Sequence, residues 1–231
     1  MKRNESVHTE TQKGEDIRSF HDAIAPIVQN AFFRGETHPD MADDFRLVAK
    51  IITKTSRSRK GGLCLDLGCG IGYFSNLAAK NMFVIGVDFS RKTILQGNKL
   101  NMSNEFIQGN ILNSSFKDNC FDIIQSTWTI EFIMEKTDLL NFANQVKRML
   151  KRNGILILVD SLVGPQGQTE EGSYITEEKW MQRYGLSPLT LNRFLWRPNT
   201  IEKIFLDSGF DTEIYEEGKL CWILVCRNGG D

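Results

Sequence analysis

The feature that most constrains the fold is an alternation of short β-rich runs with helical stretches in the middle of the 231-residue chain. Most of these runs are apolar throughout, as expected of strands that are buried on both faces. The runs are Leu63 to Leu67, Phe83 to Asp88, Glu105 to Gln108, Phe121 to Ser126 and Ile155 to Asp160. Strands that alternate with helices form parallel βαβ units with right-handed crossovers. We therefore predict a doubly wound α/β sheet that binds its ligands at the carboxyl ends of the strands.

The C-terminal part of the chain breaks this alternation. A helix is predicted from Asn199 to Ser208, followed by strand-like runs from Thr212 to Glu216 and from Leu220 to Arg227. The link between these two runs is too short for a crossover helix, so they are predicted to be antiparallel neighbours. The segment from Ser161 to Arg197 fits neither pattern, and we expect it to be an insertion over the strand ends.

The N-terminal part is predicted to be helical. Apolar positions between Asp16 and Lys54 recur at helical spacing, with a break around Gly35 to Pro39. The chain is therefore expected to have two parts. The first is an N-terminal helical lid or extension over residues 1–55, and the second is an α/β domain over residues 56–231 with a cap insertion at about residues 161–197.

Composition narrows the choice of partners. The formal net charge is −1, so no global field would hold the chain on nucleic acid or on an anionic membrane. No run has the length of a bilayer span, and the polar N-terminus lacks the apolar core of a signal peptide. The five cysteines are odd in number and the three histidines are all N-terminal, so no metal site is predicted. We expect a cytoplasmic protein with a small-molecule or short-peptide partner.

The sharpest local signal is the glycine-rich turn after the first predicted strand, where Asp66 precedes Gly68, Gly70 and Gly72. Glycines allow positive φ and a close approach of the backbone to a ligand. An acidic residue at this point would repel a pyrophosphate but suits the ammonium and sulfonium groups of S-adenosylmethionine. Asp88 ends the next strand, where a carboxylate can accept hydrogen bonds from both ribose hydroxyls. The alternative for Asp66 and for Asp88 is a helix cap.

Six segments in register resemble the class I S-adenosylmethionine-dependent methyltransferases, in particular the group that includes the ubiquinone and menaquinone C-methyltransferases. These segments are Asp66 to Gly72, Gly86 to Ser90, Gly109 to Ile111, Phe121 to Ser126, Arg152 to Leu156 and Phe205 to Phe210. The resemblance implies a Rossmann-like sheet of seven strands with the last strand antiparallel. It also implies S-adenosylmethionine as cofactor and S-adenosylhomocysteine as product. The implied cofactor-binding residues are Asp66, Gly68, Gly70, Gly72, Asp88, Phe89, Asn110, Ile111 and Ser126.

One position departs from the family pattern: Asn110 stands where the family usually has Asp. An amide oxygen can still accept a hydrogen bond from the adenine amino group, so the adenine-contacting role is kept. The alternative for Asn110 is a turn residue.

Groups that hold the methyl acceptor should follow the fourth and fifth strands, because methyl transfer chiefly requires a well-placed acceptor. Glu131 and Asp160 are the candidate catalytic residues there. Relatives often have a Glu-His pair where this chain has Glu131 and Phe132, so an obvious imidazole base is missing. A structural hydrogen bond is the alternative for Glu131, and a cap or turn is the alternative for Asp160. The candidate acceptor-binding residues are Phe20, Phe33, Thr37, Asp160, Leu162, Trp180 and Tyr184.

The acidic groups suit a cationic acceptor, because a buried carboxylate needs a partner. The chain resembles the N-methyltransferases of plantazolicin-like biosynthesis, which implies N-methylation of the N-terminal arginine amine of an azole-containing peptide natural product. The alternative among enzymes is an O- or C-methyltransferase of a quinone or phenol. The alternative from another class is a catalytically silent module that binds S-adenosylmethionine, which the missing histidine keeps open.

Overall fold

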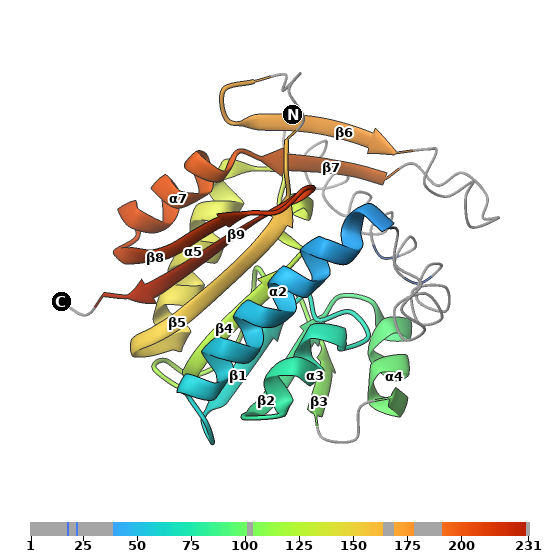
Figure 1. The fold of residues 1–231 in the computed structure, drawn as a ribbon, viewed down its shortest axis with the longest axis vertical. Coiled ribbons are helices and arrows are strands. Elements are labelled where there is room, and N and C mark those ends of the chain that lie inside the picture. Colours follow the sequence, from blue (N-terminus) through green and yellow to red (C-terminus); the bar gives the residue numbers. More distant parts are fainter. Residues whose placement is uncertain are drawn as a thin grey trace, which may run out of the picture.

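The computed structural model describes residues 18, 22, 39–100, 104–163, 169–177 and 191–229. Seven strands form the central sheet: β1 (Leu63–Leu67), β2 (Phe83–Asp88), β3 (Asn104–Gln108), β4 (Phe121–Thr127), β5 (Leu150–Ser161), β8 (Phe210–Glu217) and β9 (Cys221–Asn228). Their order is β3-β2-β1-β4-β5-β9-β8 (Figure 1). Strands β1 to β5 are parallel to their neighbours in this group, whereas β9 is antiparallel to both β5 and β8. The predicted doubly wound sheet with an antiparallel last strand is confirmed.

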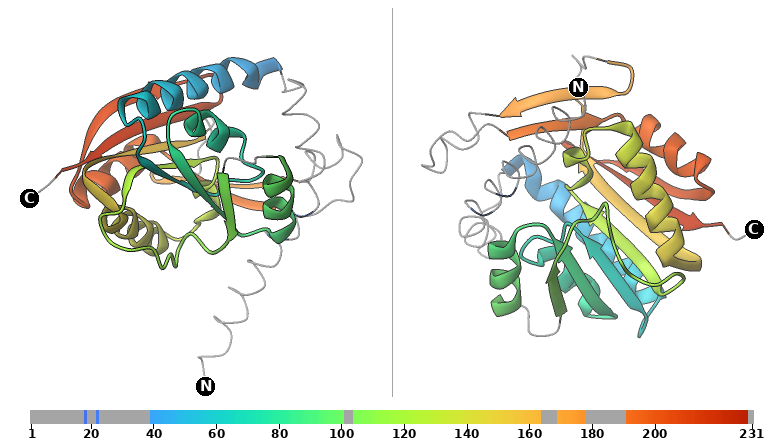
Figure 2. Two further views of the ribbon diagram at one scale, coloured as in Figure 1. Left: turned by 90° about the horizontal axis from the view of Figure 1, so that it is seen from below. Right: turned by 180° about the vertical axis from the view of Figure 1, so that it is seen from behind.

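Helices cover both faces of this sheet (Figure 2). They are α2 (Pro39–Ser58), α3 (Tyr73–Ala79), α4 (Arg91–Leu100), α5 (Lys136–Met149) and α7 (Pro198–Asp207), with a short 3-10 helix, η1 (Ile130–Phe132). Ile157 of β5 is buried with α2 and α3 on one face. The next residue, Leu158, is buried with α5 and α7 on the other. Because successive side chains of β5 enter opposite cores, the strand is apolar along most of its length.

Two boundaries differ from the sequence prediction. β5 begins at Leu150, before the predicted strand start at Ile155. Arg152 to Gly154 therefore lie inside this strand, where its pairing with β4 is irregular. Asn153 has a φ of 58° there, a conformation that asparagine tolerates better than most residues. The expected division between residues 55 and 56 falls inside α2, whose Val48 and Ile52 are fully buried against the sheet.

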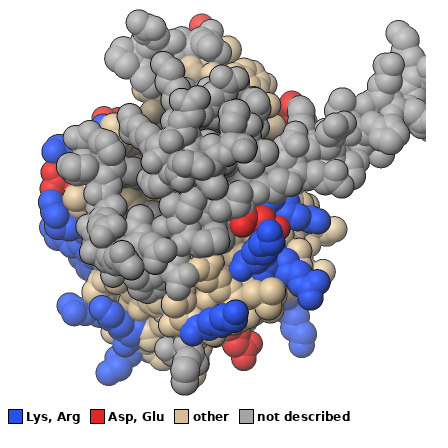
Figure 3. Space-filling model, turned by 90° about the vertical axis from the view of Figure 1, so that its right-hand side faces the viewer, with Lys and Arg blue, Asp and Glu red and all other residues tan. Residues whose placement is uncertain are grey.

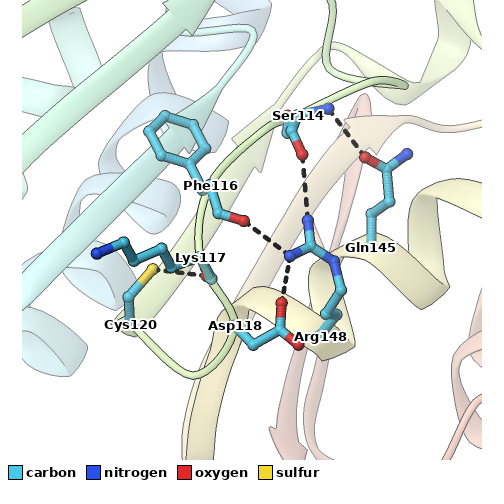
Figure 4. Close-up of polar contacts among 7 residues, drawn as sticks. All are labelled: Ser114, Phe116, Lys117, Asp118, Cys120, Gln145 and Arg148. Atoms are coloured by element: carbon cyan, nitrogen blue, oxygen red, sulfur yellow. Dashed lines mark hydrogen bonds and ion pairs between the residues drawn. The ribbon is translucent and has the colours of Figure 1, made fainter.

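The link between β3 and β4 carries Asn110 and Ile111, and α5 holds it in place (Figure 4). The guanidinium group of Arg148 donates to the carbonyl oxygens of Phe116 and Ser114, at 2.7 and 3.1 Å, and pairs with Asp118. These bonds satisfy backbone groups that a crossover helix would otherwise satisfy itself. The loop therefore has a fixed course over the end of the sheet.

The predicted insertion contains an antiparallel hairpin of β6 (Gly172–Glu177) and β7 (Leu191–Trp196). Figure 1 shows this hairpin across the end of the sheet at which β5 finishes. The indole N–H of Trp196 donates to Ile133 O at 2.8 Å, just after η1, and Lys136 pairs with Glu171 beside it. The hairpin is thus fastened to the segment that follows β4.

Two observations concern the surface of the described residues. Among them no helix is long and apolar enough to cross a membrane. On the face drawn in Figure 3, their Lys and Arg side chains lie in separate groups around the rim and form no continuous stripe.

Candidate cofactor and acceptor site

The glycine turn after β1 has the backbone conformation that the sequence predicts. Gly68, Gly70 and Gly72 have φ values of 76°, 54° and 86°, which favour glycine. The N–H groups of Gly68 and Cys69 donate to Val87 O at 2.8 and 3.0 Å, so the turn is held against β2. A Cβ on Gly70 would meet no described atom within 4 Å. The described residues therefore leave room for a ligand beside this turn.

Asp66 is buried at the end of β1. Its Oδ2 accepts hydrogen bonds from Ser75 Oγ at 2.5 Å and from Gln125 Nε2 at 2.9 Å. Its Oδ1 is buried and has no hydrogen-bond partner among the described residues. Burial raises the pKa of Asp66 to about 6, and the two hydrogen bonds oppose that rise. The N-cap of α3 is Gly72, so the structure does not use Asp66 as the helix cap that was its alternative.

Asp88 ends β2 and is tied to the backbone on both sides. Its Oδ2 accepts from the N–H of Gly70 and its Oδ1 from the N–H of Ser90, each at 2.9 Å. The cap of α4 is Ser90, whose Oγ accepts from Thr93 N at 3.1 Å, so Asp88 does not cap that helix. Each carboxylate oxygen has a second lone pair, which leaves Asp88 able to accept from hydroxyl groups.

Two residues of the N-terminal segment contact the turn after Asp88. The Arg18 guanidinium lies 4.3 Å from the centre of the Phe89 ring, in cation–π geometry. Oδ1 of Asp22 accepts from Ser90 Oγ and, at 3.4 Å, from the N–H of Lys92 at the start of α4. An anionic group is favourable at a helix N-terminus. Arg18 and Asp22 could not be selected from the sequence, because each is one charge in a strongly charged segment.

The other three predicted cofactor residues have structural partners. Asn110 Oδ1 accepts from Leu112 N at 2.9 Å, which is the turn role that the sequence left as its alternative. Ile111 packs partly buried against the core. Ser126 is buried, and its Oγ donates to Leu67 O at 2.9 Å between neighbouring strands. Cofactor contacts for these residues and for Phe89 remain predictions.

The two candidate catalytic carboxylates lie together. Oδ2 of Asp160 accepts from the N–H of Glu131 at 3.0 Å, and its Oδ1 accepts from Ser161 N at 2.7 Å. Burial, and then the adjacent Glu131 carboxylate, raise the pKa of Asp160 well above its ordinary value. Arg193 of β7 pairs with Glu131, with 2.8 Å between Nη1 and Oε1. The sequence did not predict Arg193, because the insertion that carries it has no motif.

Trp128 and Leu162 flank these carboxylates in sequence. Trp128 has a φ of 51°, which is unusual for a bulky residue, and its N–H donates to Val159 O at 2.7 Å. This backbone turns the indole onto the Phe45 ring, with 5.0 Å between ring centres and 14° between ring planes. Leu162 is partly buried, and its N–H donates to Leu220 O at 2.8 Å. The remaining acceptor-binding candidates, Phe20, Phe33, Thr37, Trp180 and Tyr184, lie outside the described residues.

Of the residues around the site that the sequence analysis missed, Gln125 had a visible signal, since it is a polar residue inside an apolar run.

Among the described residues, no group of three or more His, Cys, Asp or Glu side chains could hold a metal ion.

Known proteins resemble this chain in sequence and in fold. Residues 65–158 match the family model of the methyltransferase domain. An uncharacterised protein of Methanocaldococcus jannaschii is 33% identical over 117 residues, which are 49% of this chain and 48% of that protein. The 2-methyl-6-phytyl-1,4-hydroquinone methyltransferase of Synechocystis is 30% identical over 135 residues, which are 53% of this chain and 41% of that enzyme. The chain thus spans about half the length of these relatives.

Solved structures resemble the whole fold. The cyclase SpnF has a TM-score of 0.67 at 13% identity, over 93% of this chain and 96% of that one. The N-methyltransferase NodS of Bradyrhizobium japonicum, solved with S-adenosylhomocysteine, has a TM-score of 0.61 at 16% identity, over 87% of this chain and 98% of that one. Identities this low show the fold alone. The family match thus covers residues 65–158 of this chain, and the solved structures show that the fold is shared with proteins such as NodS.

Proposed function

We propose that this protein is an enzyme that transfers the methyl group of S-adenosylmethionine to a small acceptor. The observation that carries the proposal is the pair of buried carboxyls, Asp66 and Asp88, at the ends of adjacent strands beside the glycine turn. Oδ1 of Asp66, which has no hydrogen-bond partner among the described residues, fits a cationic ligand. The second lone pairs on the Asp88 oxygens fit the ribose hydroxyls.

The chain's own residues bind and orient the reactants. When bound, S-adenosylmethionine supplies a methyl group on a positively charged sulfur. Asp66 and Asp88 would hold it through its positive charge and its ribose, and groups after β4 and β5 would hold the acceptor. Methylation of an O–H, N–H or C–H acceptor releases one proton. Glu131 and Asp160 are the candidates for orienting the acceptor or receiving that proton.

Asp88→Ala is expected to weaken binding of S-adenosylmethionine by about ten- to a hundredfold. Losing a hydrogen bond to a charged group typically costs about 1.5–3 kcal/mol, which corresponds to that range. Isothermal titration calorimetry with S-adenosylmethionine and S-adenosylhomocysteine measures the change.

The control is Asp207→Ala, which removes an exposed aspartate at the end of α7. Because Asp88 also holds Gly70 N and Ser90 N, thermal unfolding of the cofactor-free variant shows whether the turn survives. A folded Asp88→Ala variant with unchanged affinity would show that Asp88 does not bind the ribose.

The first candidate acceptor, which the sequence suggests, is a basic amine, such as the N-terminal arginine amine of an azole-containing peptide. An α-amine with a pKa near 8 is partly neutral at working pH and can attack without a strong base, whereas a guanidinium stays charged and can only anchor. Asp160 and Glu131 would provide the anionic anchor. The position of Asp160 near the carboxyl end of β5, and of Glu131 just after β4, supports this role.

A neutral quinone or phenol is the second candidate, and one specific observation favours it. Arg193 already pairs with Glu131, so the protein itself supplies the cation that the first candidate assigns to the acceptor. The hydroquinone methyltransferase relative agrees with this second candidate. The two candidates differ in the charge of the acceptor, which one variant can test.

If the acceptor is a basic amine anchored by Asp160, Asp160→Asn is expected to lower methylation of arginine-ended azole peptides at least about tenfold, because a buried cation would lose its partner. Affinity for S-adenosylmethionine should change little. Methyl incorporation is measured by mass spectrometry, with lysine-ended peptides and hydroquinones as comparison acceptors. Full activity of the variant, with turnover of hydroquinones, would contradict the amine. Cofactor binding without turnover of any acceptor would favour the silent binding module.

A further inference from the structure

Arg193 lies where a cationic acceptor would need to place its own charge. The guanidinium comes from β7, in the inserted hairpin, and its Nη1 lies 2.8 Å from Oε1 of Glu131. The two side chains are largely buried, with exposed fractions of 15% for Arg193 and 5% for Glu131. An ion pair this far from water has a stronger mutual attraction than a surface pair.

The oxygens of this cluster differ in their partners: Oε2 of Glu131 is buried and has no hydrogen-bond partner among the described residues, whereas both oxygens of Asp160 are hydrogen-bonded. Both oxygens of Asp160 accept from backbone N–H groups, those of Glu131 and Ser161. Asp160 is 3% exposed, and its side chain lies beside Glu131 at the carboxyl ends of β5 and β4. Among the described residues, Arg193 is therefore the cation that pairs with Glu131, and Asp160 already accepts two backbone hydrogen bonds.

The hairpin is built to hold Arg193 in this place. Trp196, on the same strand, is 3% exposed and donates to Ile133 O at 2.8 Å. The Lys136–Glu171 pair joins the other side of the hairpin to the start of α5. The cluster also borders the cofactor turn, since Thr129, beside η1, donates from Oγ1 to Gly68 O at 3.4 Å.

We propose that Arg193 is a specificity-determining residue: it neutralises Glu131 and so excludes cationic acceptors from this side of the site. The inference rests on the proposed methyltransferase function. It predicts that removing the Arg193 guanidinium leaves the Glu131 carboxylate as an anionic binding site for a substrate guanidinium. The acceptor that the wild-type site takes would then be neutral.

The test compares Arg193→Met with the wild type and with the double variant Glu131→Gln/Arg193→Met, which removes both charges. Binding of L-argininamide to each protein, saturated with S-adenosylhomocysteine, is measured by isothermal titration calorimetry. Arg193→Met is expected to bind argininamide at least about tenfold more tightly than the wild type, because Glu131 has lost its partner. The double variant should lose this gain. Arg193→Lys, which keeps the charge, should resemble the wild type.

Methyl incorporation provides the second readout. Arg193→Met should raise the ratio of kcat/KM for an arginine-ended azole peptide to kcat/KM for a hydroquinone at least about tenfold, and the double variant should reverse that rise. If Arg193→Met does not fold, Arg193→Gln carries the same expectations. Equal argininamide binding by all variants, or an unshifted acceptor preference, would overturn the proposal. Failure of the methyltransferase function itself would appear separately, as absent S-adenosylhomocysteine binding or as absent methyl transfer to every acceptor by the wild type.

Discussion

Gly68→Ala is expected to lower the free energy of unfolding by about 2–5 kcal/mol. A Cβ at this position would lie 2.1 Å from Oγ1 and 2.3 Å from Cγ2 of Thr129. Thr129 is β-branched and lies two residues after the end of β4, and its own Cβ would be 2.7 Å from the added atom, so it cannot move aside without shifting the backbone. The φ of 76° adds the cost of a left-handed alanine, about 1–2 kcal/mol, to an overpacking cost of about 1–3 kcal/mol. Urea unfolding of the cofactor-free protein measures the sum.

Gly70→Ala is the matched control for this prediction. Its φ of 54° is also left-handed, but no described atom lies within 4 Å of the added Cβ. Only the backbone cost of about 1–2 kcal/mol is expected. Thr129→Gly removes the three clashing atoms. In that background, adding Gly68→Ala should lower the free energy of unfolding only as much as Gly70→Ala does in the wild type. Equal destabilisation by Gly68→Ala and Gly70→Ala would show that Thr129 does not confine the turn.

Asp66→Asn is expected to have opposite effects on stability and on cofactor binding at pH 8. Folding raises the pKa of Asp66 from 3.8 to about 6, so the folded cofactor-free protein binds a proton more tightly than the unfolded chain does. The stabilisation from that proton is complete below the ordinary carboxyl pKa near 4 and is lost as the pH rises through about 6. At pH 8 the wild type therefore contains a costly buried charge. The amide should raise the free energy of unfolding there by about 3 kcal/mol.

The same substitution should weaken binding of S-adenosylmethionine at least about tenfold at pH 8, because the ligand's positive groups lose a carboxylate partner. Wild-type affinity should fall as the pH drops below about 6, whereas the Asn variant should be nearly insensitive to pH in this range. Urea unfolding and calorimetric titration at pH 5 and pH 8 supply the data, with exposed Asp207→Asn as the control. A variant that is less stable than the wild type at pH 8 would contradict the assigned charge state.

The strands and the glycine turn were predictable because their causes are local. Strands such as β5, buried on both faces, must be apolar throughout, and a left-handed turn requires glycine at fixed positions. The partners of Asp66 were less visible. Gln125 lies beside Asp66 because β1 and β4 pair in a register that aligns these two residues, 59 positions apart in the chain. The register between β1 and β4 cannot be predicted from the sequence of either strand alone.

The acceptor side was less predictable for the same reason. Glu131 and Asp160 could be placed at strand ends, and the structure does bring them together. Arg193 could not be selected, because its role depends on where a hairpin docks and not on a local pattern. A cationic acceptor was therefore inferred from two carboxylates without the guanidinium that pairs with one of them.

The place of β9 in the sheet governs when the fold can be completed during synthesis. β9 follows β8 in the chain yet lies between β5 and β8 in the sheet, so among the described strands β8 has none to pair with until β9 is synthesised. The link just before β9 also binds Asp44 of α2, whose carboxylate accepts from the N–H groups of Lys219 and Leu220 at 2.7 and 2.8 Å. A nascent chain that ends before Lys219 exposes the edge of β5 and leaves Asp44 without these bonds. Residues 219–228 thus complete the sheet and also hold α2 in place. A pause in translation just before residue 219 would leave the edge of β5 exposed, where another strand could pair with it wrongly.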